Sequence, residues 1–275
     1  MTDIKLDYFT LLSPDPIYVK GVGHIKSPTL REISELENKI NTYYFYVNLF
    51  LMTIDKYFND FEKENTVYFY YPKELKKKML SLKNEYDALS DEAKDNITFY
   101  NFLVHDDILR IYVQYAFNFF FVEDIRFDQK NLVYSVYDEK ETVTGIIHSK
   151  NYSDVIDIIL QRINVEYKKE KTKPLKIKNK IAEKLLAKMK PSELQAKKKN
   201  DEKLDIANII SSLSSHHSTL NIVNIWDITV YQLYDQFCKT QINDSYRLLS
   251  SRVAFWGDKE NKFDTTMWLS LLNQK

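Results

Sequence analysis

The spacing of apolar residues limits the possible folds of this chain more than any other feature. From position 30 to about position 121 these residues recur every three or four positions, which is typical of helices that bury one face. Thr29 and Glu32 have the spacing of a helix-capping box, so the first helix is expected to begin at Leu30, with a break at Asn41-Thr42. The predicted helical stretches are 30–61, 72–88 and 97–121.

After position 122 the apolar period shortens to two. Three short runs rich in β-branched and aromatic residues predict antiparallel strands at 125–127, 132–137 and 142–148. Asn151 then caps another predicted helix, and helical spacing returns after position 204. The sequence therefore predicts a mainly α (α+β) fold, a helical protein with a small antiparallel β insertion and a basic linker before a C-terminal helical part.

The segment from Leu12 to Ile33 is rich in turn residues. It holds three of the six prolines and two of the four glycines, in a chain otherwise poor in both. The order IYV, GVG and HIK predicts two short strands around a glycine turn, the first over 17–19 and the second near His24. We expect a rigid arm here, formed before the first long helix.

A lysine-rich segment, Glu166 to Lys203, separates two parts of the chain. It holds 14 Lys and 6 Asp or Glu, and Pro174 and Pro191 limit any helix in it, so a flexible basic connector is expected. The predicted regions are an N-terminal arm plus helical domain at 1–122, a small α+β insertion at 123–165, the basic linker at 166–203 and a C-terminal helical region at 204–275.

Composition narrows the function classes. Lys plus Arg and Asp plus Glu both number 39, so the zero net charge gives no global reason to bind nucleic acid. A single cysteine, Cys238, excludes an intramolecular disulfide and suits a reducing compartment. The first ten residues do not read as a secretory signal, and the longest apolar run, Ile111 to Val122, is about half of a membrane span. We expect no membrane association.

The strongest enzymatic motif is His105-Asp106, because adjacent His and Asp on a helix bind metal in phosphohydrolases with an HD motif. Such a site also needs a His on an earlier helix, and His24 lies in the turn-rich arm instead. The competing interpretation is a helix N-cap with acidic residues in its first turn, which the helix dipole favours. We expect this cap and no enzyme activity.

Other reactive residues also have structural interpretations. His216 and His217 point about 100° apart on a helix and have no further ligand at metal-binding spacing, so a polar helix end is expected. Cys238 has no evident His or Asn partner and is expected to be a small buried residue. The GVG at Gly21 to Gly23 lacks the third glycine of a dinucleotide fingerprint. No cofactor and no metal are expected.

Three sequence blocks resemble proteins of tailed phages and prophages of low-G/C Gram-positive bacteria. They are PIYVKGVGHIKSPTLREI, GIIHSKNYSDVIDIIL, and NIISSLSSHHSTLNIVNIWDITVYQLYDQF together with AFWGDKENKFDTTMW. Within this group the chain is similar to tail assembly chaperones, although those are often smaller. The resemblance carries over no catalytic residue. It implies a non-catalytic factor of phage tail morphogenesis that binds tape-measure or other tail proteins in the host bacterial cytoplasm.

Alternatives remain open at this stage. The chain is also compatible with a structural tail or baseplate component of the virion, or with a phage nucleic-acid or host-defence-interacting protein. The nucleic-acid version would use Lys197, Lys198 and Lys199, but a solvated linker is the favoured interpretation of these residues. Self-association is a further option. The candidate partner-binding residues are Ile17, Tyr18, Val19, Ile25, Trp226, Tyr231 and Trp256. For the arm, strand addition to a partner competes with packing on its own chain.

Overall fold

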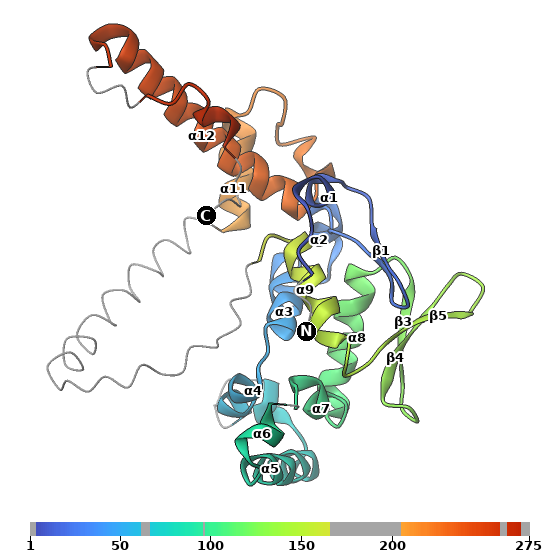
Figure 1. Cartoon of the computed structure of the whole chain (residues 1–275). Coiled ribbons are helices and arrows are strands. Elements are labelled where there is room, and N and C mark those ends of the chain that lie inside the picture. The colour runs from blue at the N-terminus through green and yellow to red at the C-terminus, as the bar shows by residue number, and fades with distance from the viewer. Residues whose placement is uncertain (1–3, 62–66, 96, 166–204, 259–262, 271–275) are drawn as a thin grey trace, which may run out of the picture. The chain divides into compact units, whose positions relative to one another are not determined.

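A computed structural model describes residues 4–61, 67–95, 97–165, 205–258 and 263–270 (Figure 1). The chain divides into two compact units, Met1–Tyr167 and Lys168–Lys275, which are described separately below. Helices dominate both units, and the described residues form two small antiparallel sheets, so the predicted mainly α (α+β) class is confirmed. No helix in these ranges is both long and apolar enough to cross a bilayer.

The first unit contains most of the helices and all the described strands. Its helices are α1 Tyr8–Leu12, α2 Leu30–Glu35, α3 Ile40–Phe50, α4 Ile54–Phe61, the 3-10 helix η1 Val67–Tyr70, α5 Lys73–Asp87, α6 Asp91–Lys94, α7 Phe99–Leu103, α8 Asp107–Phe120 and α9 Tyr152–Arg162. Its strands are β1 Ile17–Val19, β2 Gly23–Ile25, β3 Asp124–Asp128, β4 Val133–Tyr137 and β5 Val143–Ile147.

The predicted start of the first long helix is confirmed, but its predicted break is wrong. Thr29 and Glu32 form both hydrogen bonds of the capping box. The helix then ends at Glu35, and a new one begins at Ile40 after Lys39, whose φ is 49°. Asn41-Thr42 therefore lies inside α3. The predicted helix 97–121 is also two helices, α7 and α8. The chain leaves α7 after Leu103, and Asp106 is the N-cap of α8.

The three predicted strands of the middle segment form one antiparallel sheet in the order β3-β4-β5. The outer edge of β3 lies along α8 (Figure 1). There the Asn118 side chain accepts the Ile125 N–H at 2.6 Å, and Gln114 accepts the Phe127 N–H at 2.9 Å. Because α8 takes up these backbone donors, this sheet edge does not present them to another chain.

The core of the first unit is aromatic and centres on α8. Phe117 is completely buried, and its ring lies 5.3 Å from Phe50 of α3 and 5.2 Å from Tyr134 of β4. Phe117 also contacts Tyr152 at the start of α9, with 6.1 Å between ring centroids. Residues 123–165 thus share a core with the helices of 1–122, and both segments belong to the same compact unit.

Arg162, the last residue of α9, is fully buried and contacts the start of the chain. Its guanidinium donates to the backbone carbonyls of Thr10 and Ser13, both at 2.9 Å, and to that of Asp15 at 2.8 Å. Its own carbonyl accepts the Ser27 hydroxyl at 2.7 Å. Burial lowers the pKa of Arg162. The side chain therefore fixes the segment before β1 to the end of α9.

The second unit is helical throughout its described part. It contains α11 Ile206–His216, the 3-10 helix η2 Ile225–Asp227, α12 Val230–Trp256 and the 3-10 helix η3 Met267–Leu269. Thr229 and Gln232 form a capping box at the start of α12, and Gly257, with φ 76°, ends it. The predicted basic linker 166–203 lies outside the described residues, as do Lys197, Lys198 and Lys199 of the nucleic-acid alternative.

We expect Arg162→Leu to lower the free energy of unfolding of the first unit by about 3 kcal/mol or more. The substitution removes three partly buried hydrogen bonds from a charged donor, and a hydrogen bond to a charged group contributes about 1.5–3 kcal/mol. Far-UV circular dichroism during urea unfolding measures the change. Arg126→Leu is the matched control, because Arg126 is half-exposed in a surface ion pair whose loss costs less than about 1 kcal/mol. Equal unfolding midpoints for the two variants would contradict the role of Arg162.

Candidate functional site

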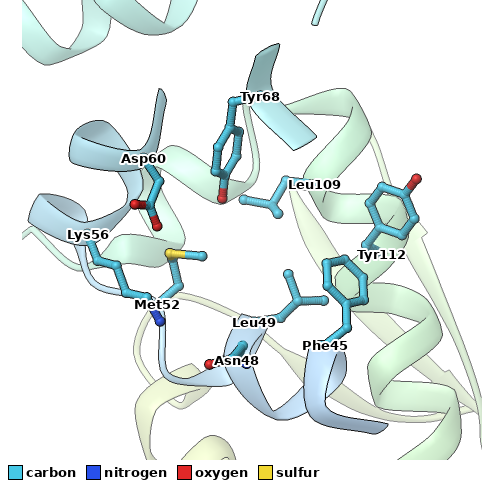
Figure 2. A pocket seen from close by; sticks show the side chains of 9 residues that line it. All are labelled: Phe45, Asn48, Leu49, Met52, Lys56, Asp60, Tyr68, Leu109 and Tyr112. Atoms are coloured by element: carbon cyan, nitrogen blue, oxygen red, sulfur yellow. The ribbon is translucent and has the colours of Figure 1, made fainter. Parts of the chain in front are cut away.

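An apolar pocket of about 290 Å³ lies between α3, α4 and α8 of the first unit (Figure 2). In the view of Figure 2 the rings of Phe45 and Tyr112 stand on one side, and the charged side chains of Lys56 and Asp60 stand on the other. The pocket is lined by Phe45, Asn48, Leu49, Met52, Lys56, Asp60, Tyr68, Leu109 and Tyr112.

The lining suits binding by apolar contact. Its exposed surface is mostly apolar, and its volume is at the lower end of the range of small-molecule pockets. Its polar groups, a side-chain amide, an ammonium, a carboxylate and two phenols, provide orientation for an occupant. The pocket therefore fits one large apolar side chain or a ring of similar size.

Asp106 fixes the beginning of α8 close to this pocket. It is fully buried, accepts the backbone N–H groups of Ile108 and Leu109 at 3.1 and 2.9 Å, and accepts the Tyr57 hydroxyl at 2.7 Å. Burial raises the pKa of Asp106, although these hydrogen bonds oppose the rise. The Tyr71 hydroxyl is also buried, and its interaction with the Asp106 carboxylate likewise opposes the rise in the pKa of Asp106. Asp106 thus holds α8 against α4.

The predicted helix cap at His105-Asp106 is confirmed. Asp106 is the N-cap of α8, and Asp107 follows in its first turn. The His105 carbonyl accepts the ammonium of Lys78 at 2.9 Å, and burial followed by the Lys78 charge lowers the pKa of His105. Among the described residues no group of three His, Cys, Asp or Glu side chains is arranged to hold a metal ion. Asp106 therefore caps the first turn of α8.

The predicted hairpin of the arm forms, with Ile17 paired to Ile25 and Val19 to Gly23. Its second strand continues onto the end of α8, where the Lys26 N–H donates to the Phe120 carbonyl at 2.9 Å and the Val122 N–H donates to the His24 carbonyl at 3.1 Å. His24 also contacts the Glu123 carboxylate through its ring and its backbone N–H. The arm therefore packs on its own chain.

The hairpin turn lies against β5. The Ile146 N–H donates to the Gly21 carbonyl at 3.0 Å. A Cβ added at Gly145 would lie 2.3 Å from the Val22 carbonyl oxygen, so only glycine fits beneath the turn. Beside this contact is a groove of about 470 Å³ that includes Lys20 and His148.

The four arm residues predicted to bind a partner differ in their exposure to solvent. Ile25 is completely buried, so it offers no surface to a partner, because its side chain lies in the core of its own unit. Ile17 and Val19 are partly exposed, and Tyr18 is 63% exposed with its ring 5.0 Å from His24. Of the four predicted residues, Tyr18 presents the most surface.

In the second unit Tyr231 is buried, so it cannot form a partner surface, whereas Trp256 is 74% exposed. Trp226 is partly exposed and donates its indole N–H to the Ile222 carbonyl at 2.8 Å. The three candidates therefore do not form one surface, and Trp256 alone lies well out in solvent.

The predicted polar helix end at His216 and His217 is confirmed. His216 lies in the last turn of α11 and contacts the Asp244 carboxylate of α12 at 2.8 Å. The His217 Nδ1 accepts the backbone N–H groups of Thr219 and Leu220 at 3.2 and 3.0 Å. Cys238 is partly buried, and burial raises the pKa of its thiol, which favours the neutral form.

Sequence reasoning missed the apolar surface around Trp256. Leu248, Leu249 and Phe255 of α12 are 74%, 40% and 81% exposed. Leu248 precedes Phe255 by seven residues, and Leu249 precedes Trp256 by seven, a spacing that places each pair on one side of a helix. This seven-residue repeat is the feature of the sequence from which the surface could have been predicted. We call these four residues the apolar face of α12.

Comparison with known proteins gives one partial match. Residues 197–273 match the family model described as the YomV second domain, and this phage-derived family supports a phage-related protein. The matched range contains all the described residues of the second unit. No curated protein matches the chain, and no solved structure matches it.

We expect Gly145→Ala to destabilise the first unit by about 1–3 kcal/mol, because the new methyl group overpacks the backbone of Val22. All three tryptophans lie in the second unit, so circular dichroism follows both units and tryptophan fluorescence follows the second. Urea unfolding should show an earlier transition by circular dichroism. Thr144→Val on the same strand is the control and should unfold like the wild type. An unshifted Gly145→Ala transition would show that the arm does not dock on β5.

Asp106 should also make stability depend on pH. Its pKa is raised in the folded chain above the ordinary value of 3.8, so the folded state binds more protons than the unfolded state between the two values. The free energy of unfolding should therefore fall as pH rises through this interval. In urea titrations at several pH values, Asp106→Asn should lack this component. Parallel pH profiles for wild type and variant would contradict the raised pKa.

Proposed function

We propose that the chain is a non-catalytic phage factor that acts in tail morphogenesis by binding other proteins, in the manner of a tail assembly chaperone. The observation that carries the proposal is the apolar face of α12, which lies inside the range matched by a phage-derived family. Contiguous exposed apolar side chains are typical of protein interaction sites. The resemblance of three sequence blocks to tail-region proteins supplies the choice of tail assembly.

The proposed mechanism is stoichiometric. A tape-measure protein is a long helical chain, and its apolar helix surfaces are exposed until tail-tube subunits assemble around it. Binding would cover these surfaces with apolar area and release the partner when the tube polymerises. The pocket between α3, α4 and α8 is a second place where one apolar side chain of such a partner would fit.

Co-expression of the full chain with the tail proteins of its phage tests this function. Mass spectrometry should find the chain together with a tape-measure or other tail protein in soluble complexes, and should not find it in purified particles. A chain retained in particles at fixed stoichiometry would instead identify a structural tail or baseplate component. Recovery with no tail protein from either fraction would overturn the proposal.

A further inference from the structure

The apolar face of α12 is the part of this helix that its own unit leaves uncovered. With about 100° between successive residues, Leu248 and Phe255 form one row and Leu249 and Trp256 form a second row, about 100° around the helix. The opposite side of the helix is occupied, because the rings of Tyr246 and Phe263 stack there with centroids 5.6 Å apart. Asp244 lies one turn before Leu248, at the edge of the first row, and contacts His216 of α11. The two rows therefore face solvent as one surface.

Two exposed arginines lie in or beside this surface. Arg252 is exposed, and its position on the helix falls between the two apolar rows. It makes no ion pair within the described residues. Arg247, beside Leu248, is also exposed, and its nearest carboxylate oxygen, on Asp244, is 3.9 Å away. The open surface thus combines four large apolar side chains with two arginines. The carboxylate at its edge, on Asp244, is already engaged by His216 and lies 3.9 Å from Arg247.

The charge distribution discriminates between possible occupants. A two-fold pairing centred on the four apolar residues would bring Arg252, which lies midway between them, close to Arg252 of the second copy, and like charges across an interface are unfavourable. An interfacial membrane helix would carry many cations on its polar face, but residues 241–256 carry only Arg247 and Arg252. A partner that supplies a carboxylate between apolar side chains complements the surface in both respects.

We propose that the apolar face of α12 and Arg252 bind an amphipathic helix of another phage protein, one that presents apolar residues at seven-residue spacing next to Asp or Glu. This inference rests on the proposed function and specifies the surface and the partner chemistry. Apolar burial supplies the attraction, as for other helices bound in grooves, and the Arg252–carboxylate contact fixes the register. The seven-residue step corresponds to about 10.5 Å along both helices.

Two fluorescent peptides test the proposal on the full chain. Both are designed helices with leucine at heptad spacing, and they differ only in having Glu or Lys beside the leucines. We expect the Glu peptide to bind at least ten-fold more tightly than the Lys peptide. The double variant Leu248→Ser/Phe255→Ser should weaken the Glu peptide at least ten-fold, and Arg252→Glu should reverse the preference. Val223→Ser, which removes an equally exposed residue of the same unit, should change neither affinity.

Several results would overturn this assignment. They are equal affinity for both peptides, an unchanged preference in Arg252→Glu, or equal loss in Val223→Ser. Binding of the wild type to phosphatidylglycerol vesicles but not to the peptides, lost in the double variant, would identify a membrane surface instead. A concentration-dependent dimer of the wild type, lost in the double variant, would identify a second copy as the occupant. Circular dichroism confirms that each variant is folded.

The same double variant separates this inference from the proposed function. If the wild type co-purifies with a tail protein and the double variant does so equally well, tail binding stands and the apolar face is not its site. If the wild type recovers no tail protein while the peptide results hold, the surface stands and the tail function fails. Loss of the tail protein in the double variant, but not in Val223→Ser, supports both.

Discussion

The buried guanidinium of Arg162 connects parts of the first unit that are far apart in the sequence. A cation inside a protein is costly unless hydrogen bonds replace its hydration, and here three backbone carbonyls of residues 10–15 do so. In return, that segment gains a fixed path leading into β1. The Ser27 hydroxyl, bound to the Arg162 carbonyl, fixes the exit from β2 in the same region. Both ends of the arm therefore depend on the end of α9.

The turn-rich arm is thereby a structural element with one exposed side. Its two ends are held near Arg162, its second strand continues onto the end of α8, and its turn contacts β5 at Gly145. The concentration of proline and glycine follows from this geometry, since Gly21 and Gly23 both have positive φ and neither position suits a residue with a side chain. Packing on its own chain, one of the two interpretations of the arm, accounts for most of its residues. Tyr18 remains the part that solvent reaches.

Local signals in the sequence predicted local structure well. The capping box of Thr29, the cap at Asp106 and the strand periods depend on residues a few positions apart, so a single sequence contains them. The break at Lys39 was misplaced because a positive φ there has no marker in its neighbours. Arg162 and Gly145 were not singled out, because their roles depend on backbone groups more than 120 residues away. The pocket likewise exists only where α3, α4 and α8 converge.

At the apolar face of α12, the local charge and not the net charge of the chain decides which partner helix can bind. The whole chain is neutral, and the lysine-rich segment 166–203 has an excess of eight positive charges, so the remainder is net negative. At physiological salt, charges are screened beyond about 8 Å, so a docked helix senses the side chains within its own contact area. There the local charge is positive, through Arg247 and Arg252. This face can therefore select an acidic helix through its own arginines, and the zero net charge of the whole chain says nothing against a specific electrostatic contact at this site.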